Sequence, residues 1–151
     1  MSKPLVDIVA ITISNPLLIG VYEDKKLIKI IKKEGKTSEI LPEIFDELLK
    51  KYEIKNIIYS KGPGSYMSIK LSYLFFKTLE ITKNINFLAK DGFYFNNNKP
   101  IKAVGNSYFI KKEGIILLEK NLEAGEFFLP QKLKIDDFSK DTSPLYVLKA
   151  V

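Results

Sequence analysis

The 151-residue sequence contains no cysteine and no histidine. Without cysteine, the chain can form no disulfide scaffold, no thiol nucleophile and no thiolate metal site. Without histidine, it lacks the commonest general base and the commonest metal ligand, which excludes a Ser-His-Asp triad and a histidine-bound metal centre. Any chemistry would therefore depend on carboxylates, lysine, tyrosine, serine and threonine.

Arginine is also absent, because all 24 basic residues are lysines, and the formal net charge is +6. Specific recognition of bases and phosphates most often uses the planar, bidentate guanidinium group. A surface built only from lysine is more typical of a composition bias than of a dedicated nucleic-acid site. A free-standing RNA-binding module, recognisable by a steep salt dependence of tRNA binding, is kept as an alternative.

A long uncharged apolar run is missing from the first residues, where Asp7 interrupts the first apolar segment. This pattern predicts neither a signal peptide nor a membrane span, so we expect a cytoplasmic protein without membrane contact. Hydrophobic residues make up 46% of the chain and charged residues 28%, a balance typical of globular proteins. The length suits one compact domain, or one domain with a reduced second lobe.

Three short β-type segments open the chain, at residues 5–13, 17–22 and 27–31. Only short polar breaks separate them, and residues 23–26 fit a hairpin turn, so an antiparallel meander is predicted. Residues 38–52 follow with apolar side chains on one half of a helical wheel and charged ones on the other, which predicts an amphipathic helix. Pro42 is tolerable there only within the first turn, so the helix is expected to start anywhere from Thr37 to Leu41.

A buried strand at residues 54–60 and a second helix at residues 66–81 are predicted next. The second helix is apolar around most of its circumference, and its charged strip consists only of Lys70, Lys77 and Glu80. One sheet cannot cover so much apolar helix surface. We therefore expect a partner to cover the remainder; a shortened second lobe that folds back over the helix is the alternative.

Beyond residue 85 the pattern weakens to short β-like pieces. These pieces lie at residues 93–95, 101–104, 108–110, 115–118 and 145–148. The predicted organisation is an α/β first lobe at residues 1–85, followed by a truncated second lobe at residues 86–151 that ends with a closing strand. No internal repeat and no heptad pattern is evident.

The clearest local motif is the turn Gly62-Pro63-Gly64-Ser65, between the predicted strand and the second helix. Two glycines permit a tight turn, and Ser65 can cap the helix. Backbone N–H groups at such a turn can also bind an anion, but the spacing matches neither a Walker A loop nor a G-x-G-x-x-G fingerprint. A structural turn is the favoured interpretation, with an anion site as the alternative.

A reduced actin-like ATPase or kinase is a further alternative, since Asp7, Glu23 and Asp24 lie on or beside the first strands, where carboxylates would hold magnesium. Thr12 and Ser14 end the first strand, where a phosphate-contacting turn would lie. No glycine accompanies them. Surface charge is the favoured interpretation of the carboxylates.

Together these segments resemble the TsaB family, also called YeaZ. The resemblance depends on Gly-Pro-Gly-Ser-Tyr at residues 62–66, Ser-Glu-Ile-Leu-Pro at residues 38–42 and the ending Ser-Pro-Leu-Tyr-Val-Leu at residues 143–148. It covers residues 1–85 well and the last ten or so passably. The chain departs from the family at residues 11–14, where Ile-Thr-Ile-Ser replaces Ile-Asp-Thr-Ser, and at residues 67–70, where Met-Ser-Ile-Lys replaces Thr-Gly-hydrophobic-Arg. Its second lobe is also shorter.

The resemblance implies an actin-like, ribonuclease-H-like fold without catalysis of its own, which serves as a platform for the related enzyme TsaD. In that family the two first-lobe helices pair with TsaD, which together with TsaE transfers threonylcarbamoyl to adenosine in tRNA. We accordingly expect no catalytic residue, cofactor or metal in this chain, tRNA contact only through the complex, and a homodimer as an open possibility. The predicted partner contacts are Ile40, Ile44, Lys70, Tyr73 and Lys77.

Overall fold

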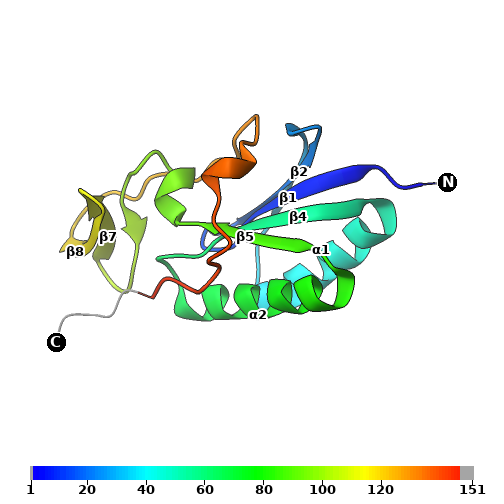
Figure 1. Ribbon diagram of the computed structural model, residues 1–151. Helices are drawn as coiled ribbons and strands as arrows, with labels where there is room; N and C mark the ends of the chain where they lie inside the picture. Colours follow the sequence, from blue (N-terminus) through cyan, green and yellow to red (C-terminus); the bar gives the residue numbers. More distant parts are fainter. Residues whose placement is uncertain (1, 147–151) are drawn as a thin grey trace.

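The computed structural model describes residues 2–146 and contains a five-stranded sheet, two long helices and a small three-stranded sheet (Figure 1). The large sheet consists of β1 (Leu5–Ile11), β2 (Leu17–Glu23), β3 (Lys26–Lys33), β4 (Glu53–Ser60) and β5 (Asn86–Lys90). Their order is β3-β2-β1-β4-β5. Strands β1, β2 and β3 pair antiparallel, which confirms the predicted meander, while β1, β4 and β5 run parallel.

The hairpin between β2 and β3 turns through Asp24 and Lys25, whose φ angles of 50° and 65° are both left-handed. Two left-handed residues match the right-handed twist of the flanking strands, as in a type I′ turn. This confirms the predicted hairpin. Strand β1 ends at Ile11, two residues before the predicted end.

The two long helices are α1 (Thr37–Lys51) and α2 (Tyr66–Lys83), each between parallel strands of the large sheet. Helix α1 begins at Thr37, within the range of starts predicted for it, but Pro42 then lies in its second turn and not in the first, where it was expected. The helix continues because proline removes only one N–H donor, and the carbonyl of Ser38 that loses it belongs to an exposed residue.

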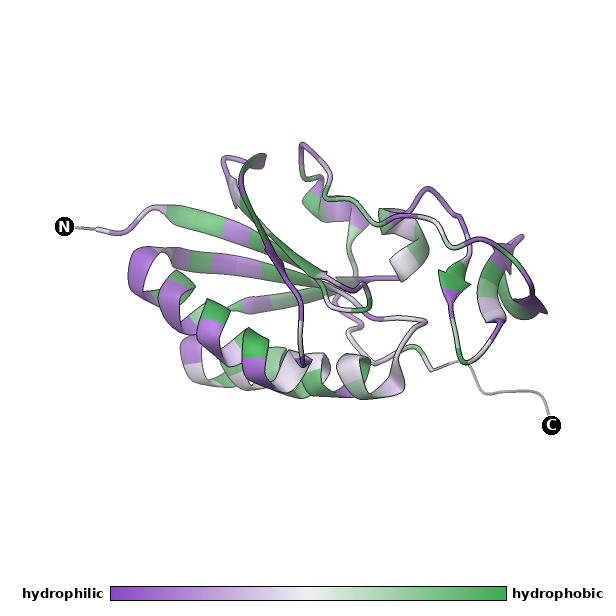
Figure 2. Ribbon diagram, turned by 180° about the vertical axis from the view of Figure 1, so that it is seen from behind, coloured by the Kyte–Doolittle hydropathy of each residue, from purple (hydrophilic) through white to green (hydrophobic). Residues whose placement is uncertain are grey.

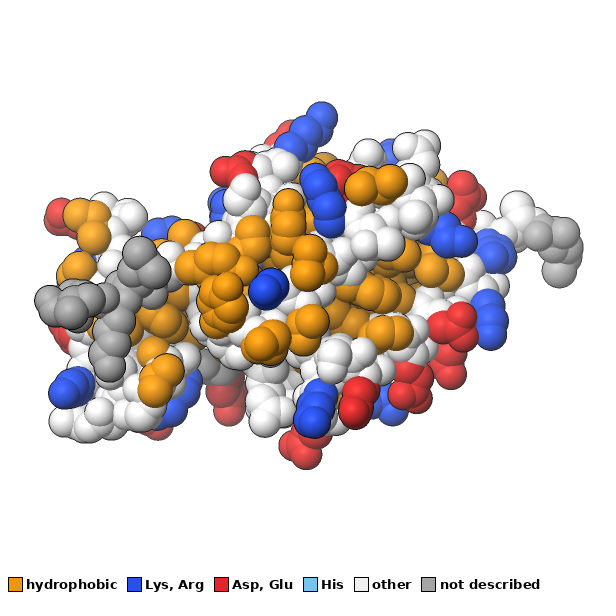
Figure 3. Space-filling view, turned by 90° about the horizontal axis from the view of Figure 1, so that it is seen from below, with side chains coloured by type: hydrophobic (Ala, Val, Ile, Leu, Met, Phe, Trp, Pro, Cys, Tyr) orange, Lys and Arg blue, Asp and Glu red, His pale blue; other side chains and the backbone are white. Residues whose placement is uncertain are grey.

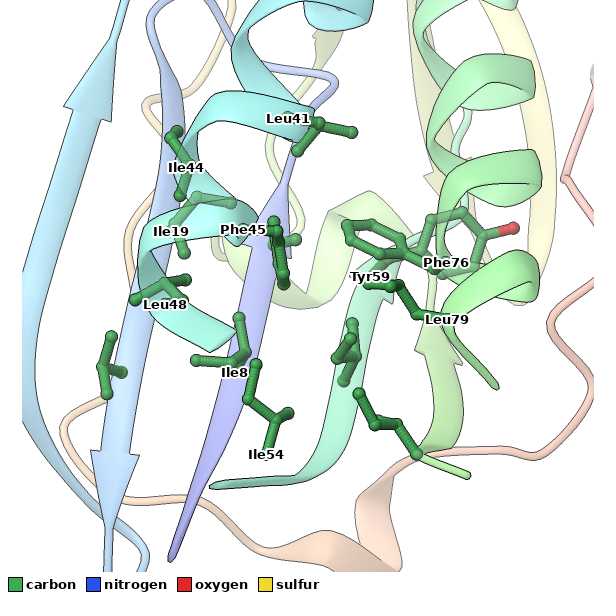
Figure 4. Close-up of a cluster of buried hydrophobic side chains, with 14 of the residues drawn as sticks. Ile8, Ile19, Leu41, Ile44, Phe45, Leu48, Ile54, Tyr59, Phe76 and Leu79 are labelled. Carbon is green, nitrogen blue, oxygen red and sulfur yellow. The ribbon is translucent and has the colours of Figure 1, made fainter. Parts of the chain in front are cut away.

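Both helices pack on one face of the large sheet, below it in Figure 1, where they form the main core with β1, β2, β4 and β5. Figure 4 shows this core, in which Phe45 of α1 and Phe76 of α2 meet edge to face with ring centroids 5.3 Å apart. In Figure 2, hydrophobic and hydrophilic bands alternate along the strands and helices, as expected for amphipathic elements that share a core.

The opposite face of the large sheet is covered by residues 127–138, which contain no long helix or strand and are drawn in orange in Figure 1. Leu129, Leu133 and Phe138 supply the apolar cover. The segment is held by hydrogen bonds from the Tyr22 hydroxyl to the Pro130 carbonyl, 2.6 Å, and between the backbones of β3 and the segment. This layer was not foreseen from the sequence.

The remaining part contains the small sheet β6 (Ile101–Lys102), β7 (Ser107–Lys112) and β8 (Ile115–Lys120), in the order β6-β7-β8. Two short 3-10 helices span Gly92–Phe95 and Ile135–Asp137. The prediction of a β-like piece at residues 93–95 was wrong, because the Asp91 side chain accepts a hydrogen bond from the backbone N–H of Tyr94 and caps a 3-10 turn.

Strand β5 belongs to the large sheet, so the first unit extends at least to Lys90, past the predicted boundary at residue 85. The predicted closing strand at residues 145–148 lies partly outside the described residues. Its described members, Leu145 and Tyr146, form no strand. Within residues 2–146, no helix combines the length and the apolar character needed to cross a bilayer.

Candidate functional site

The outward face of α2 carries a row of apolar side chains. Met67, Leu74 and Ile81 follow each other at intervals of seven residues and are 58%, 51% and 75% exposed. Half-buried Leu71 and exposed Thr78 lie between them, which gives a spacing of four and three residues in alternation. This is the spacing of a helix that packs against another helix. We call Met67, Leu71, Leu74, Thr78 and Ile81 the α2 seam.

Figure 3 views this side of the molecule and shows apolar side chains gathered over it. The row is hard to recognise in the sequence because the buried side of the helix is apolar as well, through Ile69, Phe76 and Leu79. Burial separates the two faces, and it shows that the helix has more apolar surface than the sheet and α1 cover, as predicted.

Charged and aromatic side chains flank the α2 seam. Lys70 is exposed beside Met67 and Leu74 on the helix. Lys77 is partly exposed, and its Nζ lies 2.8 Å from Oε1 of Glu80. That hydrogen bond raises the pKa of Lys77. The predicted contacts Lys70 and Lys77 therefore lie at the edge of the exposed apolar face.

Two other predicted contacts, Ile40 and Ile44, do not lie on this surface. Both are buried members of the main core, 9% and 6% exposed, and Figure 4 shows Ile44 beside Ile19 of β2. They face inward because the sheet lies on the apolar half of α1. The outward half of α1 instead carries exposed charged residues, namely Glu39, Glu43, Asp46, Glu47 and Lys50.

The fifth predicted contact, Tyr73, is neither exposed like Lys70 nor buried like Ile44. It is half-buried and packs against the main core, with its ring centroid 6.1 Å from that of Phe87. Its position on the helix, seven residues after Tyr66 and three before Phe76, places it at the margin of the exposed face. A substitution at Tyr73 therefore affects the core as well as the surface.

The Gly62–Ser65 turn joins β4 to α2 and is packed on several sides. Gly62 is buried with φ +114°, and its carbonyl oxygen accepts a hydrogen bond of 2.8 Å from the backbone N–H of Gly92. A β-carbon on Gly64 would come within 2.9 Å of the Ile13 side chain. Ser65 caps α2, since its Oγ accepts from the Ser68 N–H at 3.4 Å. These contacts explain why glycine stands at positions 62 and 64 and serine at position 65: each has a structural role in the turn.

The turn also contacts the segment that ends the described chain, residues 139–146, which we call the C-terminal strap. Ser139 exchanges two backbone hydrogen bonds with Ala89 of β5, and the Leu145 N–H donates to the Lys61 carbonyl at 2.7 Å. The strap ends with Tyr146, whose ring centroid lies 4.6 Å from that of Tyr66, the first residue of α2. Burial and the neighbouring Tyr66 raise the pKa of Tyr146.

The carboxylate candidates do not form a magnesium site. Asp7 is buried, contrary to the prediction of a surface charge; one of its oxygens lies 2.7 Å from Lys25 Nζ and the other accepts from Asn56 Nδ2 at 2.7 Å. Glu23 and Asp24 are exposed at the hairpin. In the described part of the chain, no three acidic side chains come together as metal ligands.

The hydroxyl candidates are engaged in internal hydrogen bonds. Thr12 is buried, and its Oγ1 lies 2.6 Å from Oγ of Ser72 in α2. The Oγ of Ser14 lies 2.8 Å from the Pro16 carbonyl oxygen. A cleft of about 1110 Å³ opens beside this loop, between the Gly62–Ser65 turn and the small sheet, and Lys32, Lys102 and Glu126 are its charged lining residues.

Comparison with known proteins gives structural matches only. No protein-family model and no curated protein matches the sequence. Among solved structures, the chain is similar to YeaZ from Pseudomonas aeruginosa, with a TM-score of 0.57 and 12% sequence identity over 77% of this chain. It is also similar to an uncharacterised protein described as resembling the peptidase YeaZ of the same organism, with a TM-score of 0.54 and 12% identity over 80% of this chain.

The chain spans 65% of the length of each of these two proteins. In this chain the predicted succession of meander, helix, strand and helix is present up to α2, and the parallel strand β5, which was not predicted, follows it. At this identity the likeness concerns the fold. The chain therefore has the α/β, actin-like and ribonuclease-H-like fold of YeaZ, as the resemblance of its motifs implied.

Proposed function

We propose that this chain is a non-catalytic protein of the TsaB (YeaZ) family that binds TsaD through the α2 seam. In this role it acts as a cytoplasmic platform for TsaD and TsaE in the transfer of threonylcarbamoyl to adenosine in tRNA, and it meets tRNA only within the complex. The observation that carries the proposal is the exposed apolar row of Met67, Leu74 and Ile81 on a helix that already has a complete buried face.

The energetics of the α2 seam favour a helical partner. Full burial of one large apolar side chain stabilises a contact by about 1.5–3 kcal/mol, and three such side chains, Met67, Leu74 and Ile81, project from every second turn of α2. A partner helix that follows the same spacing covers all three at once. The proposal thus accounts for an exposed surface that a free-standing globular domain has little reason to keep.

The charges around the α2 seam indicate how such a partner is oriented. Lys70 and Lys77 lie along one side of the row, while the outward half of α1 is mainly acidic. A partner surface with carboxylates opposite the lysines and basic groups opposite α1 would be favoured. Electrostatic complementarity of this kind contributes mainly to specificity and to the association rate.

The chemistry of the chain supports a role without catalysis. The sequence has neither cysteine nor histidine, and the hydroxyls of Thr12 and Ser14 are engaged in internal hydrogen bonds. We therefore expect no nucleotide hydrolysis by the isolated protein. Calorimetric binding of ATP with magnesium at micromolar affinity, together with turnover, would make the chain a reduced actin-like ATPase instead.

The direct test is co-expression with the TsaD of the same organism and size-exclusion chromatography of the product. We expect the wild type to co-elute with TsaD and Leu74→Glu to elute alone, because a carboxylate at the centre of the α2 seam cannot be buried against an apolar helix. Glutamate is a good helix former, so the variant should fold.

The matched control is Ile115→Glu, which alters a residue of β8 that is 61% exposed and does not belong to α2. This variant should co-elute as the wild type does. If the wild type fails to co-elute, the proposed partner is wrong. If Leu74→Glu co-elutes and Ile115→Glu does not, the small sheet and not α2 is the binding surface.

A further inference from the structure

One end of the α2 seam is Met67, in the first turn of the helix. Tyr66 is the first residue of α2 and directly precedes Met67, and the Tyr146 ring packs on it from the C-terminal strap. We propose that the C-terminal strap forms one end of the partner-binding face, with Tyr66 and Tyr146 acting as a composite aromatic contact. This inference rests on the proposed function and adds a second segment of the chain to its interface.

The rings of Tyr66 and Tyr146 pack against each other, but neither buries the other. Their centroids are 4.6 Å apart with an angle of 33° between the ring planes, which lies within the range of favourable aromatic pairs. Tyr66 nevertheless remains 57% exposed and Tyr146 39% exposed. A large part of both rings is thus free to contact a partner.

The Tyr146 ring is held in place because the strap is bound to the sheet at several points. The backbones of Ala89 and Ser139 exchange hydrogen bonds of 2.8 and 3.0 Å. The Tyr59 hydroxyl donates to the carbonyl oxygen of buried Thr142, and the hydrogen bond from Leu145 to Lys61 fixes the residue before Tyr146. A side chain that is already positioned loses less conformational entropy on binding.

The chemistry of the pair defines the partner group that it fits. Tyrosine combines a large rigid apolar ring with a hydroxyl, and it is enriched among the residues that contribute most to interfaces. Tyr66 precedes Met67 in the sequence, and both line the same cleft at the start of α2, so a helix that lies along the seam would bring one of its ends near the two rings. That end should carry an apolar or aromatic side chain with a hydrogen-bond acceptor beside it.

The inference is tested by calorimetric titration of TsaD with the wild type, Tyr66→Ala, Tyr146→Ala and the double variant. We expect each single variant to bind about tenfold more weakly. The double variant should be little weaker than either single one, because the two rings act as one unit. Tyr146→Phe keeps the ring and loses only the hydroxyl, so it should bind more tightly than Tyr146→Ala and less tightly than the wild type. Tyr108→Ala, which removes a half-buried tyrosine from β7, is the control and should leave binding unchanged.

Hydrogen exchange of the unmodified protein gives a second measurement that does not depend on a variant. Amides of residues 139–146 should exchange more slowly in the complex than in the free chain. Unchanged binding by Tyr146→Ala, without added protection of the strap, overturns the inference while leaving TsaD binding by the seam intact. Tighter binding by Tyr146→Ala also overturns it, since the strap would then obstruct the partner. Failure of the wild type to bind TsaD overturns the proposed function and this inference together.

Discussion

The carbonyl oxygen of Leu145 lies 2.5 Å from the position that a β-carbon on Gly62 would occupy. The same hypothetical β-carbon would lie 2.9 Å from Cδ1 of Ile69 in α2. Both distances are shorter than side-chain carbons tolerate, and φ of Gly62 is +114°, where residues other than glycine are strained. The strap, the turn and α2 therefore meet at a point that only glycine can occupy.

Gly62→Ala should accordingly destabilise the fold by about 2 kcal/mol or more, because it combines backbone strain with a clash. Gly114→Ala is the matched control, since Gly114 also has a positive φ, +79°, but no neighbouring atom within 4 Å. Urea denaturation of the two variants separates the clash from the strain. Equal losses would mean that the strap moves aside freely at Leu145.

Ile44→Ala and Leu74→Ala should affect different properties, although both residues are apolar and helical. Ile44 is buried in the main core, and its truncation should cost about 2–4 kcal/mol of unfolding free energy. Leu74 is exposed, so its truncation should change stability by less than about 0.5 kcal/mol while weakening TsaD binding. Thermal melts together with a binding titration distinguish the two. A large stability loss at Leu74 would place this residue in the core and contradict our description of the α2 seam.

Removal of Lys25 should cost more stability than replacement of Asp7 by asparagine. In Lys25→Met the buried carboxylate of Asp7 keeps only its hydrogen bond from Asn56, which should cost about 1–3 kcal/mol. In Asp7→Asn the released lysine, already 44% exposed, turns into solvent. Chemical denaturation at neutral pH measures both. The reverse order would show that the carboxylate tolerates isolation better than the ammonium group does.

High pH should destabilise the fold through its buried tyrosines. Burial raises the pKa of Tyr59, and burial together with the hydrogen bond to Asp137 raises the pKa of Tyr94 to about 12. Since the unfolded value is about 10, folding favours the protonated phenols. Their stabilising contribution is complete below about pH 10 and is lost as the pH rises towards about 12.

Comparison with Tyr59→Phe isolates the contribution of Tyr59, because the two proteins are identical in every other ionisable group. At neutral pH this variant should be less stable by about 1 kcal/mol, because the hydrogen bond to the Thr142 carbonyl is lost. The difference from the wild type should shrink as the pH rises above about 10, since the unfolded wild type then gains an ionised phenolate. If the stabilities of the wild type and Tyr59→Phe differ by the same amount at every pH in this range, the pKa of Tyr59 is not raised in the folded protein.

The elements predicted correctly are those in which apolar and polar residues are clearly separated in the sequence. Helix α1 has charges on one half and apolar residues on the other, and the hairpin at Asp24 and Lys25 has a short polar break between β-type strands. Strand β5 was missed because Asn86–Lys90 follows α2 after only a two-residue break and includes Asn, Ala and Lys, which are weak strand formers. The cover of residues 127–138 gives no periodicity to recognise, since apart from the three-residue 3-10 helix Ile135–Asp137 it contains no helix and no strand.

The candidate site was predicted to the level of the helix but not of the residue. Periodicity correctly indicated that α2 has more apolar surface than one sheet can cover. It could not show whether the sheet or a partner covers the single apolar face of α1, and in the structure the sheet covers it, with Ile40 and Ile44 in the core. It also could not show that Tyr146 lies on Tyr66, a contact between distant positions that depends on the path of the strap.

The layer that covers the second face of the large sheet also determines what the chain exposes while it is being synthesised. All five strands of the large sheet are complete at Lys90, but Leu129, Leu133 and Phe138 follow much later in the sequence. A nascent chain that has released β5 from the ribosome therefore displays Val9, Ile11 and Ile58 of an assembled sheet to the solvent, with nothing yet made to cover them. Until residues 127–138 have been made, this face is exposed apolar surface of the kind that makes an incomplete fold prone to aggregation.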